Sequence, residues 1–175
     1  SVGVNYLVVD NCTFDDFSDN GVYLVGGGDD IFITNNTFDN TSSGFNAAIH
    51  TRAGSTGNHD NITISGNTII CNDTGSQEAI MIHYDDSYGD EGIGFYIYDN
   101  DVSGHARYAL ELESGDDVRV INNTLSGVGG TGAIYINEHG ARTLPIYFCS
   151  NILLGGDTYM MFVNDCTEMR MCNNL

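Results

Sequence analysis

The segments FYIYDNDV (residues 95–102) and VRVINNTL (118–125) follow one pattern. Apolar and other residues alternate over four positions, two small or polar residues follow, and an apolar residue comes soon after. Such alternation with a period of two is typical of a β-strand that buries one face. The same pattern recurs in LVVDNCTF (7–14), IFITNNTF (31–38), ITISGNTI (62–69), IYFCSNIL (146–153) and MRMCNNL (169–175).

The spacing of these segments indicates a solenoid. Their second polar positions are 24, 31, 33, 23, 28 and 23 residues apart, which gives a minimum coil of 23 residues plus insertions. A second series of short apolar segments lies between them, at 21–25, 47–51, 79–83, 108–112, 132–136 and 158–162. Each coil should therefore contribute at least two strands, and no segment sustains a helical period. We expect a single all-β domain over residues 1–175, a right-handed single-stranded parallel β-helix of about six or seven coils.

An asparagine column marks the same slot of each coil. It comprises Asn36, Asn67, Asn100, Asn123, Asn151 and Asn174, with Cys12 in the first coil. Asparagine tolerates the left-handed backbone angles of a tight turn. Stacked amides can also hydrogen-bond along the column and satisfy buried polar groups. We therefore expect an inward asparagine ladder.

The repeated apolar–x–apolar–x–Asn–Asn–Thr–apolar unit resembles the parallel β-helix, or pectin-lyase-like, superfamily over essentially the whole chain. That superfamily includes polysaccharide lyases, polygalacturonases, alginate epimerases, phage tailspikes and non-catalytic surface proteins, so the fold alone does not choose a function. Lyases of this kind use Lys or Arg as the base while Ca²⁺ binds the uronate. This chain has no lysine, and only Arg52 or Arg142 lies near the expected site. The sequence thus disfavours a polyuronate lyase.

The charge is strongly negative, with 24 acidic residues against five basic ones and a net charge of −19. Nucleic acid is excluded as a partner on this ground, because its phosphates need positive charge. No stretch of 18 apolar residues is present, so no membrane insertion is expected. Two explanations of the acidity remain open: adaptation to high salt, and calcium binding through Asp-rich loops.

Insertions between the second series and the next asparagine segment should gather at one corner, where solenoids often bind ligands. Outward strand positions there place Glu111, Glu113 and His83 together as candidate acid and base groups. Candidate contacts to a sugar are Arg52, Tyr135, Asn137 and His139. Candidate calcium ligands are Asp85, Asp86, Asp90 and Glu91. The competing interpretation is that Glu111 and Glu113 are solvated surface carboxylates of a very acidic protein.

Two further columns deserve a structural test. Cys149 and Cys172 share a slot in consecutive coils, so they either form a disulfide or stack as free thiols. Another row holds aromatic residues and arginines, which would bind sugar rings or a neighbouring subunit, or would simply line the sheet: Phe32, Thr63, Tyr96, Arg119, Tyr147 and Arg170.

The chain starts and stops within the repeat and shows no amphipathic cap, so we expect a fragment or a domain without caps of its own. Its leading functional hypothesis is a secreted or cell-surface module with a structural or adhesive role. It would associate with copies of itself, or with neighbouring domains of a longer chain, through its coil ends. The first alternative is a carbohydrate-active enzyme, and the second is a tailspike-like module that binds polysaccharide. Converging carboxylates with perturbed titration would favour the enzyme.

Overall fold

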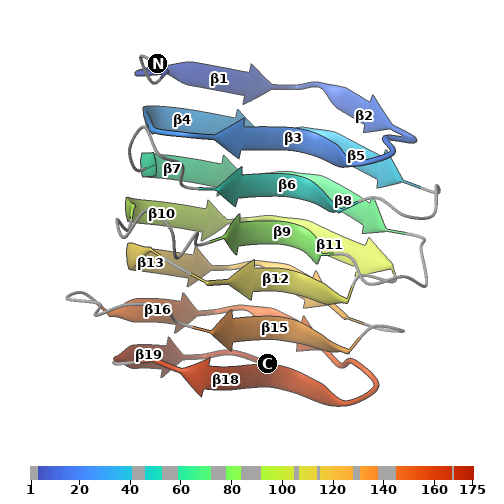
Figure 1. Cartoon of the computed structure of the whole chain (residues 1–175). Helices are drawn as coiled ribbons and strands as arrows, with labels where there is room; N and C mark the ends of the chain where they lie inside the picture. The colour runs from blue at the N-terminus through green and yellow to red at the C-terminus, as the bar shows by residue number, and fades with distance from the viewer. Residues whose placement is uncertain are drawn as a thin grey trace.

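The computed structural model describes residues 4–40, 46–52, 59–71, 78–83, 92–104, 107–113, 115–127, 131–137, 145–166 and 168–175. Within these ranges the chain winds into a solenoid of three parallel sheets, which Figure 1 shows as a stack running from the N-terminus to the C-terminus. All strand pairs are parallel and join equivalent strands of adjacent coils, for example β10 with β13. The expected parallel β-helix is therefore confirmed.

The strands fall into three series. Sheet A contains β1 (Leu7–Asp10), β4 (Gly28–Thr34), β7 (His59–Ser65), β10 (Ile93–Tyr98), β13 (Asp116–Ile121), β16 (Ile146–Cys149) and β19 (Met169–Cys172). Sheet B contains β2 (Thr13–Asp15), β5 (Thr37–Asn40), β8 (Thr68–Cys71), β11 (Asp101–Gly104), β14 (Thr124–Ser126) and β17 (Ile152–Leu154). Sheet C contains β3 (Asn20–Val25), β6 (Ala47–Arg52), β9 (Glu78–His83), β12 (Tyr108–Leu112), β15 (Gly132–Asn137) and β18 (Tyr159–Asp165). The described strands thus form six coils of three strands, and β19 begins a seventh.

The core is a set of aliphatic columns between the sheets. In sheet A, Ile31 and Ile33 pair with Ile62 and Ile64, and these four side chains are at most 1% exposed. Burial of each such side chain stabilises the fold by about 1.5–3 kcal/mol. Because alternate residues point inward, the remaining positions of each strand form rows on the outer faces.

The asparagine ladder is present. Asn67 donates from its backbone N–H and from Nδ2 to Oδ1 of Asn100, at 3.0 and 2.9 Å, and Nδ2 also reaches the carbonyl of Ile33 at 2.9 Å. The same bonds repeat at Asn36, Asn123 and Asn151. The ladder side chains therefore bridge successive coils.

One detail of the ladder expectation was wrong. The left-handed backbone belongs to the residue before each ladder asparagine, as at Asn35 (φ 55°) and Asn122 (φ 56°). Gly66 takes this position in the third coil, with φ 63°. The turn residue and the ladder residue are thus different, because one bends the chain and the other points its amide inward.

Cys149 and Cys172 form a disulfide between β16 and β19, with their Cα atoms 4.6 Å apart. They are therefore not stacked free thiols. Among the described residues, no helix is long and apolar enough to cross a membrane.

Candidate functional site

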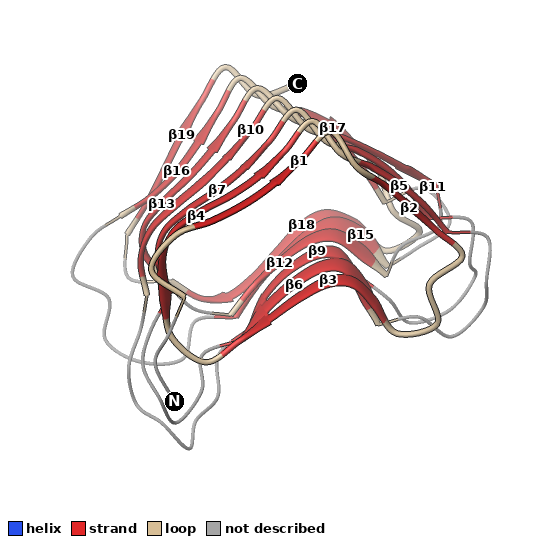
Figure 2. Cartoon of the chain, turned by 90° about the horizontal axis from the view of Figure 1, so that it is seen from above, coloured by secondary structure: helices blue, strands red, loops and turns tan. Residues whose placement is uncertain are grey.

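The outer face of sheet C carries the candidate site. Its strands bow toward the interior of the coil, as the view along the axis shows (Figure 2). The register of the six strands aligns one outward row across all the coils, formed by Tyr23, His50, Met81, Glu111, Tyr135 and Phe162. Glu111 thus stands in the middle of a row of large side chains.

Two carboxyl groups and one guanidinium meet where β9 and β12 begin. Nε of Arg107 lies 3.0 Å from Oε1 of Glu78, and Nη2 lies 3.4 Å from Oε2 of Glu111. The side chains of Glu78 and Glu111 are only 3% and 2% exposed, whereas Arg107 is 39% exposed. Ionising both buried carboxyl groups costs free energy, because a single arginine can balance only one of the two negative charges.

The electrostatics of this pair favour a bound proton. Burial, and then the hydrogen bond and negative charge of Glu78, raise the pKa of Glu111 to about 8. Burial also raises the pKa of Glu78, although the hydrogen bond donated by Glu111 opposes that shift. At neutral pH Glu111 therefore holds a proton, which makes it a weak acid of the strength that acid catalysis near neutral pH requires.

The network continues from this buried pair toward the surface. The Glu111 carboxyl is hydrogen-bonded to that of Glu113, the residue that follows β12. Oε2 of Glu113 lies 3.4 Å from Nε2 of His83, and these two side chains are 17% and 29% exposed. Titratable groups therefore form a continuous series from the buried Glu78 to the partly exposed pair of Glu113 and His83.

Aromatic rings flank the cluster on both sides along the coil axis. Tyr108 stacks on Tyr135 with centroids 4.8 Å apart, and Tyr135 stacks on Phe162 at 5.3 Å. On the other side His50 lies between Tyr23, at 4.6 Å, and the ring of His83, at 5.6 Å. Burial, followed by the charge of His83, lowers the pKa of His50 to about 4, so His50 is neutral near pH 7.

The structure brings Glu111, Glu113 and His83 together, as the sequence suggested, and places Tyr135 beside Glu111. The interpretation of Glu111 as a solvated carboxylate is wrong, because its side chain is buried and lies beside the guanidinium of Arg107. Arg52 lies in register with His83, one coil away.

Asn137 ends β15 and accepts a hydrogen bond from Nδ2 of Asn164 at 2.7 Å. His139 and the candidate calcium ligands Asp85, Asp86, Asp90 and Glu91 lie outside the described residues. Among the residues that are described, no group of three or more His, Cys, Asp or Glu side chains could hold a metal ion.

Sequence reasoning missed Glu78 and Arg107. It looked for the site at the corner that follows the sheet C strands, whereas these two residues lie at the opposite end of those strands. The available signal was a pair of opposite charges, each next to the start of an apolar strand in successive coils. Such a pair faces across one coil spacing of about 4.8 Å.

Comparison with known proteins supports the fold. The family model described as "Right handed beta helix region" matches residues 2–150 of the chain. No curated protein matches the chain, and no solved structure does. Because the family model covers most of the sequence and the strands form parallel coils, the chain belongs to the right-handed beta-helix family.

Proposed function

We propose that the chain is a carbohydrate-active enzyme whose acid–base groups are the carboxyl cluster of sheet C, defined here as Glu78, Glu111 and Glu113, together with His83. The observation that supports this most is the pKa of Glu111, which is about 8 in a network that reaches the partly exposed pair of Glu113 and His83. Perturbed titration of several converging groups is typical of catalytic sites.

The chemistry that fits this arrangement is hydrolysis of a glycosidic bond. The protonated cluster donates a proton to the glycosidic oxygen through Glu113, while a water molecule attacks from the opposite face of the sugar ring and releases a proton to the solvent. The hydroxyl of that water bonds to the anomeric carbon as the bond to the leaving sugar breaks. The imidazole of His83, whose Nε2 lies 3.4 Å from Oε2 of Glu113, then relays a proton from the solvent back to Glu113, while Glu111 keeps its own proton at neutral pH.

An uncharged polysaccharide is the substrate that the electrostatics favour. The net charge of −19 and the three carboxyl groups of the cluster repel a polyanion. Tyr135 and Phe162 on one side, and Tyr23 on the other, place partly exposed aromatic rings along the coil axis. A sugar chain that follows this axis would contact rings on both sides of the acid groups.

The test is release of reducing ends from a panel of neutral glucans, mannans, xylans and galactans. We expect cleavage of at least one of them, and a loss of about 100-fold or more in E113Q and H83Q. Asp101→Asn serves as the matched control, because Asp101 is an exposed carboxylate on sheet B. Cleavage of no member of the panel, or equal cleavage by all the variants, would contradict the proposal.

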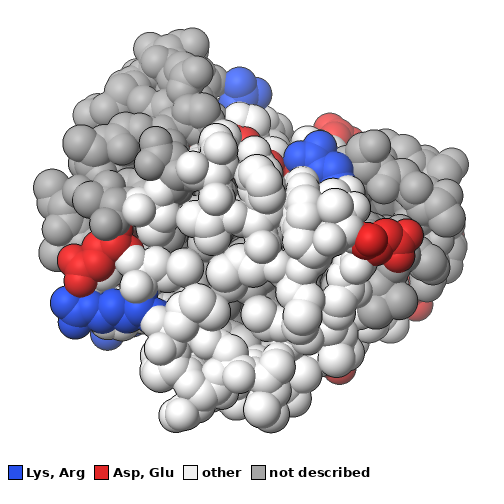
Figure 3. Space-filling model, turned by 90° about the horizontal axis from the view of Figure 1, so that it is seen from below, with Lys and Arg blue, Asp and Glu red and all other residues white. Residues whose placement is uncertain are grey.

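A second candidate function is structural, and the distribution of exposed apolar side chains favours it. Of the fourteen exposed large hydrophobic residues among those described, eleven lie in the first coil or in the segment 152–175. They are Val4, Tyr6, Val8, Tyr23, Val25, Ile152, Leu154, Met160, Val163, Met171 and Leu175. Figure 3 views the face formed by the last coil, and its described centre is free of charged side chains.

We propose that copies of this chain stack end to end through these two faces, which would place β1 of the next copy beside β19. Equivalent strands pair in this way at every internal coil boundary. The role would be that of a structural or adhesive module outside the cell. The disulfide between Cys149 and Cys172 fits the oxidising environment of such a location.

Light scattering over a range of protein concentrations tests this stacking. We expect oligomers in the wild type and a shift to monomer in Met171→Asp, which places a charge on the last coil, where Met171 is 50% exposed. Ile93→Asp is the control, because Ile93 is also 50% exposed but belongs to a middle coil. A wild type that stays monomeric, or an equal effect of the two substitutions, would contradict the stacking.

A further inference from the structure

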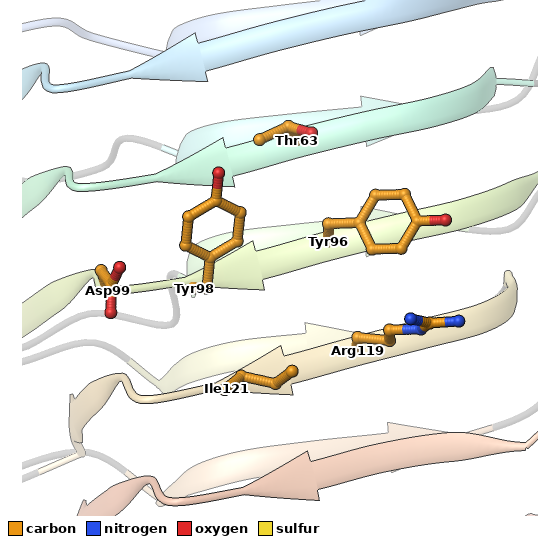
Figure 4. A pocket seen from close by; sticks show the side chains of 6 residues that line it. All are labelled: Thr63, Tyr96, Tyr98, Asp99, Arg119 and Ile121. Atoms are coloured by element: carbon orange, nitrogen blue, oxygen red, sulfur yellow. The ribbon is translucent and has the colours of Figure 1, made fainter.

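The outer face of sheet A carries a hollow that plays no part in the proposed catalysis. Its volume is about 430 Å³, and Figure 4 shows the side chains that line it: Thr63, Tyr96, Tyr98, Asp99, Arg119 and Ile121. Sheets A and C lie on different sides of the coil (Figure 2), so this hollow is separate from the carboxyl cluster. Its volume falls in the range of small-ligand sites, about 300–1,000 Å³.

Ring and aliphatic surfaces dominate the hollow. Tyr96 and Tyr98 project from alternate positions of β10, and Ile121 stands in register with Tyr98 on β13. Tyr98 and Ile121 remain 40% and 38% exposed, although both are large apolar side chains in a middle coil. The other exposed apolar residues lie mainly in the first and last coils, so this pair marks a distinct apolar spot on the side of the solenoid.

The arginine in the hollow is held in place and electrically balanced. The guanidinium of Arg119 lies over the Tyr96 ring, 5.5 Å from its centroid, and 5.8 Å from that of Tyr147. Asp117 accepts hydrogen bonds from its Nε and Nη2 at 2.9 and 3.1 Å. These contacts fix the orientation of Arg119 and offset its charge, so the hollow has little attraction for anions.

A second hollow adjoins the first along the coil axis. It measures about 320 Å³ and is lined by Arg119, Ile121, Tyr147 and Cys149, so the two hollows share a wall. Adjacent coils are about 4.8 Å apart, which is close to the length of one sugar unit in an extended chain. An extended oligosaccharide lying along the axis could therefore place successive units in the two hollows.

We infer that this pair of hollows on sheet A binds an uncharged oligosaccharide, as a site separate from the catalytic face. The apolar faces of sugar rings would pack on Tyr98, Ile121 and Tyr147, while hydroxyl groups would bond to Asp99, Thr63 and Arg119. Acidic sugars are disfavoured because Asp99 is an exposed carboxylate and the whole chain carries −19.

The experiment measures binding of neutral β-1,4-linked gluco- and manno-oligosaccharides, from disaccharide to hexasaccharide, by calorimetry. It uses the E113Q chain, so that cleavage does not interfere and failure of the catalytic proposal leaves the result readable. We expect tighter binding of the longer oligosaccharides. Tyr98→Ala should weaken binding at least tenfold, and Asp99→Asn should weaken it several-fold.

Asp99→Asn is expected to fold like the wild type, because Asp99 has a φ of 57° and asparagine tolerates that conformation. A loss of binding in this variant would therefore not come from misfolding. Tyr6→Ala is the control, since Tyr6 is a 68% exposed tyrosine in the first coil. Equal binding by Tyr98→Ala and Tyr6→Ala would overturn the inference. So would the absence of binding by every probe, or tighter binding of oligouronates than of neutral oligosaccharides.

Discussion

A single ladder residue, Asn100, links three successive coils. Its Oδ1 accepts hydrogen bonds from the backbone N–H and Nδ2 of Asn67, at 3.0 and 2.9 Å. Its Nδ2 donates to the carbonyl of Ile64 and to Oδ1 of Asn123, both at 2.9 Å. Because Asn100 is 2% exposed, water cannot replace these partners if the side chain is removed.

Asn100→Ala is therefore expected to lower the free energy of unfolding by about 3 kcal/mol. Asn174→Ala should cost about 1 kcal/mol, because Asn174 ends the ladder and is only partly buried, so that water can bond to the groups left behind. Urea denaturation followed by circular dichroism measures both values. Equal losses in the two variants would show that the ladder bonds do not depend on burial.

Glu111 should make the stability depend on pH with a definite sign. Its pKa rises from 4.5 in the unfolded chain to about 8 in the folded one. Between these values the folded state binds more protons, so the free energy of unfolding falls as pH increases. The contribution is fully present below pH 4.5 and is lost as pH rises through about 8.

His50 acts in the opposite direction. Its pKa falls from 6.5 to about 4 on folding, so its contribution is present above pH 6.5 and is lost as pH falls toward 4. We expect Glu111→Gln to remove the decline in stability on the alkaline side of this range and to leave the acid side unchanged. Thermal unfolding across pH, compared with Asp101→Asn, checks this. An unchanged alkaline decline in Glu111→Gln would contradict the assigned titration.

At the scale of the strands, the register explains both the success and the limits of sequence reasoning. The period-two pattern of 95–98 and 118–121 predicted the sheet A register, which the structure confirms. It could also place Met81, Glu111 and Tyr135 in one row. It could not show that Glu111 lies beside a guanidinium, because Arg107 precedes β12 and stands outside its alternating pattern. A contact made by a long side chain from outside the strand does not appear in the period-two pattern of the sequence.

The disulfide between β16 and β19 shows how one column can secure the last strand. Cys149 and Cys172 are 23 residues apart in the sequence, and closing a loop of that size stabilises a fold by about 3 kcal/mol. We expect Cys172→Ser to lower the free energy of unfolding by this amount. Cys12→Ser, at an exposed free cysteine, should have little effect. If a reducing agent leaves the stability of the wild type unchanged, the disulfide does not carry this role.

For the whole molecule, the solenoid separates three kinds of surface. Sheet C presents the carboxyl cluster, sheet A presents the two hollows, and the first and last coils hold most of the exposed apolar side chains. The fold could be predicted from the repeat because every coil repeats the same local pattern. The assignment of a function to each surface could not, because it depends on single residues such as Glu78 and Tyr98 that break the pattern. The adaptation to high salt inferred from the charge stays a prediction.

The most direct test of the acid–base site is the titration of its carboxyl groups by NMR. The chain has six glutamates, so selective ¹³C labelling of their side-chain carboxyls gives a small set of signals. One of them should titrate near pH 8 and disappear in Glu111→Gln. If every glutamate instead titrates near its ordinary pKa of about 4.3, the cluster holds no proton at neutral pH and the proposed catalysis loses its basis.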